Sequence, residues 1–257
     1  MKRIIDAHIH LDHYKEEEIS LIMEELDQTH CSNLISVSFD LESCKKNLEL
    51  AKQYSQVKPT FGFHPEQEIP SDRDVAALLD WMSENRDEMA AVGEIGLPYY
   101  LRSENPTISL EPYIDLLNEF LKFAKKWDKP VVLHAVYDDA PVVCDLLEKH
   151  NIKRAHFHWF KGDPLTIERM LKNGYFISVT PDVLYEEEIK QLVINYSLKQ
   201  MMVETDGPWR FEGEFSGKMT HPAMIHESVK MISKLKNEDL SFMYKRLYEN
   251  TKLFYRI

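Results

Sequence analysis

The stretch Ile4-Ile5-Asp6-Ala7-His8-Ile9-His10 carries the pattern on which the predicted fold and site depend. Four of its seven positions are apolar, which indicates a buried strand. Side chains two apart on a strand point the same way, so Asp6, His8 and His10 share one polar face. Neutral imidazole is a good ligand for zinc and similar ions, and two imidazoles at a strand end suit half of a metal site. An edge strand with two solvated histidines fits the spacing equally well, so the rest of the chain has to decide.

Length and composition limit the class of protein. The chain has 257 residues, of which 44% are hydrophobic and 29% charged, which suits one large barrel or two small domains. Cys31, Cys44 and Cys144 are far apart and form no CxxC pair, a usage typical of a reducing compartment without a disulfide framework. No apolar h-region follows the basic residues at positions 2 and 3, and no apolar run has transmembrane length. We therefore expect a cytoplasmic protein that does not contact the membrane.

The net charge of −12 argues against tight, extended binding of nucleic acid. Duplex binding of that kind relies on a basic surface, because the release of counterions drives the affinity. A nucleic-acid substrate is still compatible with this charge if a pair of divalent metal ions supplies a local positive field.

Strand and helix patterns alternate along the whole chain. After the first stretch, strands are predicted at 33–39, 59–63, 89–95, 130–134, 154–158, 175–179 and 200–204. Helices are predicted at 16–29, 41–54, 71–86, 110–127, 140–150, 163–172, 184–196, 221–234 and 237–254. About eight strand–helix units without a linker predict an α/β protein, a TIM-type (β/α)8 barrel that forms a single domain over residues 1–257. A doubly wound open sheet is the competing architecture, but no Gly-rich phosphate loop follows the first strand.

Imidazoles and carboxylates recur at the predicted strand ends. In a closed parallel barrel these ends meet at one rim, where active sites form. The residues concerned are His8, His10, His64, Glu94, His134, His158 and Asp206. Taken singly, each is more often a hydrogen-bonded rim residue or a turn former, and only their repeated placement argues for a site. Nitrogen and carboxylate ligands without thiolate fit zinc, manganese or another borderline divalent ion. Because one tetrahedral ion takes about four ligands, six ligands suit two ions that share a bridging Glu94.

Six short motifs occur in the order found in the TatD family of metal-dependent hydrolases, within the amidohydrolase-like superfamily. The motifs are Asp6-Ala-His8-Ile-His10-Leu, Gly62-Phe-His64-Pro65, Val92-Gly-Glu94-Ile-Gly96-Leu, Pro130-Val-Val-Leu-His134, His158-Trp-Phe-Lys-Gly162 and Glu204-Thr-Asp206-Gly-Pro208. The chain resembles this family over residues 3–208, and more weakly beyond them. The resemblance implies a (β/α)8 barrel with the activity of a metal-dependent phosphodiesterase on DNA, a deoxyribonuclease.

The resemblance also implies a role for each motif residue. One ion would be held by His8, His10, Glu94 and Asp206, and a second by Glu94, His134 and His158. Glu94, as the bridge, and Asp206, which would orient the attacking water and shuttle its proton, are the catalytic candidates. His64 would lie near the scissile phosphate.

Several other histidines and one aspartate need separate interpretations. His156 faces the same side as His158 but lies deeper, so we expect a core histidine or a support for a ligand. Asp6 lies below His8 in the same way, and either holds a ligand imidazole or makes a structural hydrogen bond. Surface positions are predicted for His13, His30, His150 and His226.

The expected substrate contacts depart from the family pattern. The family's Ser-Arg after the fifth-strand histidine is replaced by Ala135-Val136, and Asp138 and Asp139 follow, so a phosphate-contacting arginine is missing. Candidate substrate contacts, besides His64, are Lys161, Trp209 and Lys218, with Arg210 as a further cation. Three aromatic residues would line the mouth and either stack on a base or pack against the protein, namely Tyr99, Trp159 and Trp209.

Three functions are compatible with these features. The first is a two-metal phosphodiesterase that acts on DNA or another phosphodiester. The second is an amidohydrolase that cleaves a C–N or ester bond of a small metabolite. The missing arginine and the net acidity of the chain favour this function. One major subtype of amidohydrolase carries a carbamylated lysine where this chain has His134, which counts against that subtype. The third is a metal-binding scaffold without catalysis, although no ligand position is degraded.

Overall fold

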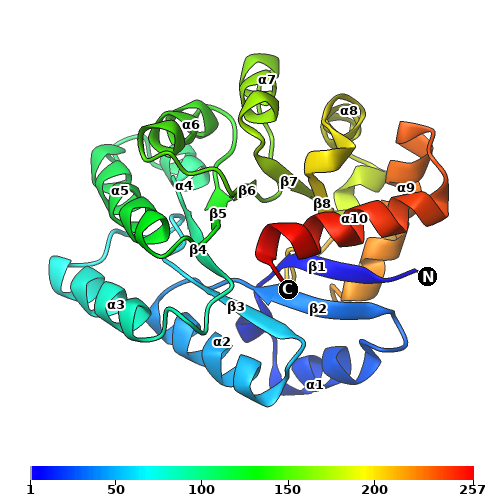
Figure 1. Ribbon diagram of the computed structural model, residues 1–257, viewed down its shortest axis with the longest axis horizontal. Helices are drawn as coiled ribbons and strands as arrows, with labels where there is room; N and C mark the ends of the chain where they lie inside the picture. The colour runs from blue at the N-terminus through cyan, green and yellow to red at the C-terminus, as the bar shows by residue number, and fades with distance from the viewer. Residues whose placement is uncertain (1) are drawn as a thin grey trace.

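Eight parallel strands form one sheet in chain order (Figure 1). The computed structural model describes residues 2–257. The strands are β1 (Ile4–Ile9), β2 (Cys31–Ser36), β3 (Val57–Phe61), β4 (Ala91–Gly96), β5 (Val131–His134), β6 (Ala155–Phe157), β7 (Phe176–Val179) and β8 (Met201–Val203). Just beyond β8, the amide of Asp206 donates to the carbonyl of His8 at 2.9 Å, and the amide of His10 donates to the carbonyl of Gly207 at 2.8 Å. The first and last strands therefore meet, which confirms the predicted TIM-type barrel over the open sheet.

Helices follow the strands and form a ring outside the sheet (Figure 1). They are α1 (Glu16–Glu25), α2 (Leu41–Gln53), α3 (Asp72–Glu84), α4 (Tyr99–Glu104), α5 (Glu111–Lys126), α6 (Asp139–Lys149), α7 (Pro164–Asn173), α8 (Glu187–Asn195), α9 (Ile225–Lys236) and α10 (Leu240–Tyr255). Short 3-10 turns occupy η1 (Leu11–His13), η2 (Pro181–Leu184), η3 (Leu198–Gln200), η4 (Gly213–Phe215) and η5 (Pro222–Met224). Over residues 2–257, none of the helices has the length and apolar character needed to span a membrane.

The ends of α7 follow local sequence signals. Asp163 precedes this helix, and its side chain accepts hydrogen bonds from the amides of Leu165 and Thr166. Pro164 occupies the first turn, where its missing N–H is not needed. Gly174 ends the helix with a φ of 78°, a left-handed conformation that favours glycine. The predicted start and end of this helix are confirmed to within one residue.

The structure differs from the prediction at the end of α1 and in the presence of α4, and α8, α9 and α10 begin three or four residues later than predicted. The helix predicted over 16–29 ends at Glu25, where the Thr29 hydroxyl donates back to the Glu25 carbonyl at 2.9 Å and His30 reverses the chain with a φ of 53°. The short helix α4 was not predicted at all. The carboxylate of Glu66 accepts hydrogen bonds from the amides that begin α4, Tyr100 at 2.9 Å and Leu101 at 2.6 Å.

The core has two layers, one between the sheet and the helices and one inside the barrel. The inner layer includes Ile5, Val132 and Met202, and Phe254 and Tyr255 of α10 pack against it. Figure 1 shows α10 lying across one end of the barrel. The Tyr255 hydroxyl donates to the carbonyl of Ala7 at 3.3 Å, so the end of α10 reaches the barrel interior.

Asp6 joins β1 to the residues that follow β8. Its Oδ1 accepts a hydrogen bond from the amide of Thr205 at 2.9 Å, and its Oδ2 accepts one from the Thr205 hydroxyl. Among residues 2–257 the Nδ1 atom of His8 has no hydrogen-bond partner, so Asp6 does not hold this imidazole. Of the two roles expected for Asp6, the structure shows the structural hydrogen bond.

We expect Asp6→Ala to lower the free energy of unfolding by about 2–4 kcal/mol, because it leaves two buried donors of Thr205 unpaired. Urea denaturation measures the change. Asp80→Ala, at an exposed position of α3, is the control and should change the free energy little. Equal urea midpoints for the two variants would contradict the proposed role of Asp6 in holding β1 to the residues after β8.

Candidate metal centre

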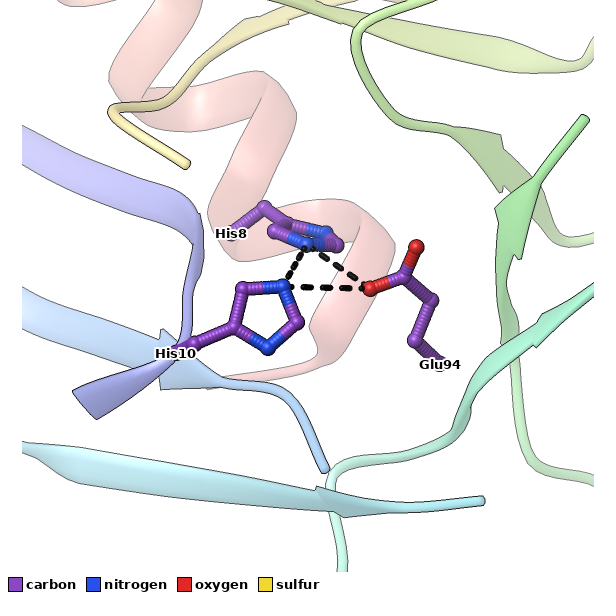
Figure 2. A group of neighbouring side chains, drawn as sticks. All are labelled: His8, His10 and Glu94. Atoms are coloured by element: carbon purple, nitrogen blue, oxygen red, sulfur yellow. Dashed lines mark hydrogen bonds and ion pairs between the residues drawn. The ribbon is translucent and has the colours of Figure 1, made fainter. Parts of the chain in front are cut away.

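Two imidazoles and two carboxylates gather around one point at the carboxyl end of the strands. The Nε2 atoms of His8 and His10 lie 3.1 Å and 3.4 Å from Oε2 of Glu94, and 3.4 Å from each other. Figure 2 shows these three side chains pointing toward one another. Oδ1 of Asp206 completes the group, 3.4 Å from His8 Nε2 and 3.5 Å from His10 Nε2.

A second group surrounds the other oxygen of Glu94. Oε1 of Glu94 lies 2.7 Å from Nε2 of His158, 3.2 Å from Nδ1 of His134 and 3.4 Å from Nε2 of His64. His134 Nδ1 and His158 Nε2 are 3.2 Å apart. The structure therefore brings together all six residues predicted as ligands, and His64 lies beside them. Each oxygen of Glu94 faces its own set of imidazoles.

The geometry of the first group fits a divalent ion. Tetrahedral coordination with bonds of about 2.0–2.1 Å places ligand atoms about 3.3–3.4 Å apart, and the distances among the four atoms quoted above span 3.1–3.5 Å. Both oxygens of Glu94 and Oδ1 of Asp206 are buried without a hydrogen-bond partner in the part of the chain that the structure describes. Because unpaired buried carboxylate oxygens are costly, a cation between these atoms would supply the missing partner.

The charges at the site also suit metal binding. Burial by itself would raise the pKa of Glu94, but the surrounding imidazoles, first of all His158, hold it well below its ordinary value. Burial likewise opposes ionisation of Asp206, but the nearby imidazole of His10, 3.5 Å away through Nε2, and the other imidazoles keep its pKa low. Burial lowers the pKa of His8 to about 4. At neutral pH, Glu94 and Asp206 are therefore anionic and His8 is neutral, which are the protonation states that bind a cation. Burial by itself would lower the pKa of His134, but Glu66 and Glu94 raise it to about 10, so an ion that binds this imidazole has to displace a proton.

Glu66 supports His134, and the sequence analysis did not single it out. Its Oε1 lies 3.0 Å from Nε2 of His134, while Nδ1 of the same ring faces Glu94. A carboxylate on the outer nitrogen fixes the orientation of a ligand imidazole. The available signal was a carboxylate two residues after His64, close to the end of β3.

Glu204 and His156 lie below the site. The carboxyl group of Glu204 accepts hydrogen bonds from the amide of Trp159 at 2.8 Å and from the hydroxyl of Ser178, and so holds the segment that carries His158. Burial raises the pKa of Glu204 well above its ordinary value. His156 contacts the hydroxyls of Ser178 and Tyr255 and is fully buried, which matches the expectation of a deeper core histidine.

Of the predicted substrate contacts, His64 lies beside the ligand atoms, and the other three are Lys161, Trp209 and Lys218. Nζ of Lys161 lies 5.2 Å from the ring centroid of Trp159, and Nζ of Lys218 lies 5.7 Å from that of Phe215. The side chain of Trp209 is 53% exposed. Within residues 2–257, no hydrogen bond or ion pair joins these three side chains to the six ligand candidates.

Of the four histidines predicted at the surface, His13 and His30 are exposed, whereas His150 and His226 are only partly exposed, and the contacts of His226 show why. Its Nδ1 lies 2.8 Å from the Tyr244 hydroxyl, and its Nε2 lies 2.7 Å from the carbonyl of Thr29, so the half-buried ring joins α9 to α10 and to the turn before β2. The sequence around His226 gave no indication that the ring would contact Tyr244 or Thr29.

Comparisons with known proteins identify the family of this chain. The family model described as TatD related DNase matches residues 5–256. An uncharacterized metal-dependent hydrolase of Haemophilus influenzae is 37% identical over 99% of this chain and 100% of its own length. Human deoxyribonuclease TATDN3 is 24% identical over 80% of this chain and 78% of its own.

Solved structures show the same fold. YjjV, a TatD homolog from Escherichia coli, superposes with a TM-score of 0.89 and 25% identity over the whole of both chains. A TatD family hydrolase from Entamoeba histolytica superposes with a TM-score of 0.83 and 21% identity, over 98% of this chain and 97% of its own. Together with the family model and the relative from Haemophilus influenzae, these matches show that the chain belongs to the TatD family of metal-dependent hydrolases.

Proposed function

We propose that this hydrolase is a phosphodiesterase of the deoxyribonuclease type that binds two divalent ions, of zinc, manganese or magnesium. The observation that supports two ions is the arrangement of Glu94, whose two oxygens each face a separate group of imidazoles. His8, His10 and Asp206 would complete one site, and His134 and His158 the other. Ions bound there would neutralise phosphate charge and make a bound water more acidic. DNA as the substrate is suggested by the description of the matching family and by the name of the human relative.

Each residue of the site would then have a separate role in the reaction. The buried carboxylate of Asp206 is held in its ionised form and suits acceptance of the proton of the attacking water. Glu94 fixes the two groups of ligands relative to each other. His64, 8% exposed and 3.4 Å from Glu94 through Nε2, suits contact with the phosphate. Lys161, Trp209 and Lys218 are the proposed contacts for the rest of the substrate.

The test combines metal analysis with an activity assay. We expect about two ions per chain, and hydrolysis of bis(4-nitrophenyl) phosphate and of single-stranded DNA that a chelator abolishes and added Mg²⁺, Mn²⁺ or Zn²⁺ restores. A protein that holds metal but hydrolyses neither substrate with any of these ions would contradict the proposal. The three buried, free cysteines fit a reducing compartment, so we propose that the enzyme acts in the cytoplasm.

Cleavage of a C–N or ester bond in a small metabolite is the second candidate function. The observation in its favour is the set of carboxylates near His134, where Glu66 contacts the ring and Asp139, the first residue of α6, is buried. Such a set disfavours a polyanion and tolerates a neutral or cationic substrate. A panel of small amides, lactones and carboxylic esters, tested on the same metal-loaded protein, distinguishes the two functions.

We expect Glu66→Gln to weaken binding of the ion next to His134 by about 10- to 100-fold, because the change removes the charge that orients this imidazole. Competition with a chelating dye measures the affinity. Glu68→Gln, at an exposed position two residues further along the chain, is the matched control and should bind the ion as the wild type does. An equal affinity for the two variants would show that Glu66 does not support the site.

A further inference from the structure

Three tyrosines form one packed group beside the metal centre, and we call Tyr99, Tyr100 and Tyr137 the tyrosine platform. The ring centroids of Tyr99 and Tyr137 are 4.9 Å apart, and those of Tyr99 and Tyr100 are 5.4 Å apart with the rings nearly perpendicular. Two of the three tyrosines lie on α4 and the third follows β5. The contacts among the rings therefore hold them in place before any substrate binds.

Tyr100 is the member of the platform that faces the site. Its ring centroid lies 6.0 Å from that of His134, and 43% of the residue is exposed. Its amide donates to Oε1 of Glu66, the same oxygen that contacts His134, so one carboxylate positions both residues. Burial raises the pKa of the Tyr100 hydroxyl, and Glu66 adds to this effect.

The other aromatic side chains at the rim are less suited to stacking. The ring of Trp159 packs near Phe211, its Nε1 donates to Asp182 at 2.5 Å, and Lys161 lies over it. Trp209 is 53% exposed, and in residues 2–257 no aromatic ring packs against it. A ring that is already ordered loses less entropy when a ligand stacks on it, which favours the platform over Trp209.

Two carboxylates contact the platform, and Arg102 on the same helix is already paired. Glu66 adjoins Tyr100, and the Tyr137 hydroxyl donates to Glu188 at 3.3 Å. Nη1 of Arg102, on α4, lies 3.1 Å from Oδ1 of the buried Asp139. A nucleic-acid strand that continued past this side would bring its further phosphates against acidic groups. The surroundings therefore suit a flat, uncharged ring better than a run of phosphates.

We propose that the tyrosine platform binds the base of a single nucleoside unit next to the scissile phosphate, so that the preferred substrate is a short, base-bearing phosphodiester. This inference rests on the proposed phosphodiesterase function and adds the class of substrate. Stacking on an aromatic side chain tolerates any base, since every base has a π face. The platform thus selects for the presence of a base and not for its identity.

The test compares two esters that release the same 4-nitrophenol, thymidine 5′-(4-nitrophenyl phosphate) and methyl 4-nitrophenyl phosphate. The ratio of their kcat/KM values reports what the nucleoside adds. We expect a ratio of at least about ten for the wild type, within the range that stacking supplies. Tyr100→Ala should bring the ratio close to one, mainly through KM, and Tyr100→Phe should retain it. Phe242→Ala, which removes an aromatic side chain that is 39% exposed on α10, is the control and should leave the ratio unchanged.

A second measurement separates failure of this inference from failure of the proposed function. If metal-loaded wild type hydrolyses neither ester, the phosphodiesterase assignment fails, and binding of thymidine 5′-monophosphate then decides the role of the platform. Binding about ten-fold weaker in Tyr100→Ala than in Phe242→Ala supports the platform, and equal binding overturns it. An unchanged ratio of the two esters in Tyr100→Ala also overturns it. A long oligothymidylate that competes about ten-fold more tightly than the mononucleotide would overturn the preference for a short substrate.

Discussion

Glu94→Gln should lower kcat/KM for phosphodiester hydrolysis at least about a thousand-fold and remove most of the bound metal. Glu94 is the residue with one oxygen in each ligand group, 3.1 Å from His8 on one side and 2.7 Å from His158 on the other. The glutamine side chain presents one oxygen and one NH2 group, so it cannot serve both ligand groups and places hydrogen-bond donors against one of them. Metal analysis and the rate of bis(4-nitrophenyl) phosphate hydrolysis measure the two losses.

Glu188→Gln is the matched control, because this carboxylate is exposed and contacts the tyrosine platform but no ligand candidate. It should retain the metal content and most of the turnover of bis(4-nitrophenyl) phosphate. Circular dichroism of both variants establishes that they are folded. If Glu94→Gln still held two ions and kept wild-type activity, the bridging role would be wrong.

The alternation of strands and helices was predictable because each element buries a face whose period can be read over a few residues. The convergence of the ligand candidates followed from the same pattern, since the strand ends of a closed parallel barrel meet at one rim. His8 and His10, two residues apart at the end of β1, show this most directly. Their Nε2 atoms meet 3.4 Å apart, as expected for side chains on one face of a strand.

Contacts between residues far apart in the sequence could not be predicted in this way. Glu66 accepts a hydrogen bond from the amide of Tyr100 at the start of α4, although the two residues are 34 positions apart in the sequence. It also contacts His134, which is 68 positions away. The six residues of α4 are too few to show a helical period, so no local signal marks the helix. The tyrosine platform depends on α4 and was therefore hidden as well, although Tyr99 was a candidate for stacking.

The sequence also did not predict which ring nitrogen of each histidine faces Glu94. His8, His10 and His158 present Nε2 to Glu94, whereas His134 presents Nδ1. The difference follows from Glu66, which lies at the Nε2 atom of His134. A strand pattern fixes the face on which a side chain lies but not which ring nitrogen points at its neighbour.

Asp206→Asn should lower kcat about 10²- to 10⁴-fold, the range that a positioned general base contributes. The amide keeps the shape of the side chain, and its oxygen can stay near His8 and His10, where Oδ1 of Asp206 now lies at 3.4 Å and 3.5 Å. It cannot accept the proton of the attacking water. We therefore expect a far larger loss in kcat than in bound metal, which distinguishes Asp206 from Glu94.

Single-turnover rates and metal analysis of the same Asp206→Asn sample measure this difference. Asp145→Asn, whose carboxylate is exposed on α6 and pairs with Arg169, is the control and should match the wild type in both. Loss of metal in proportion to the loss of kcat would show that Asp206 acts only as a ligand. An unchanged kcat would remove it from the reaction, and the proton of the attacking water would then need another acceptor among the side chains at the mouth of the barrel.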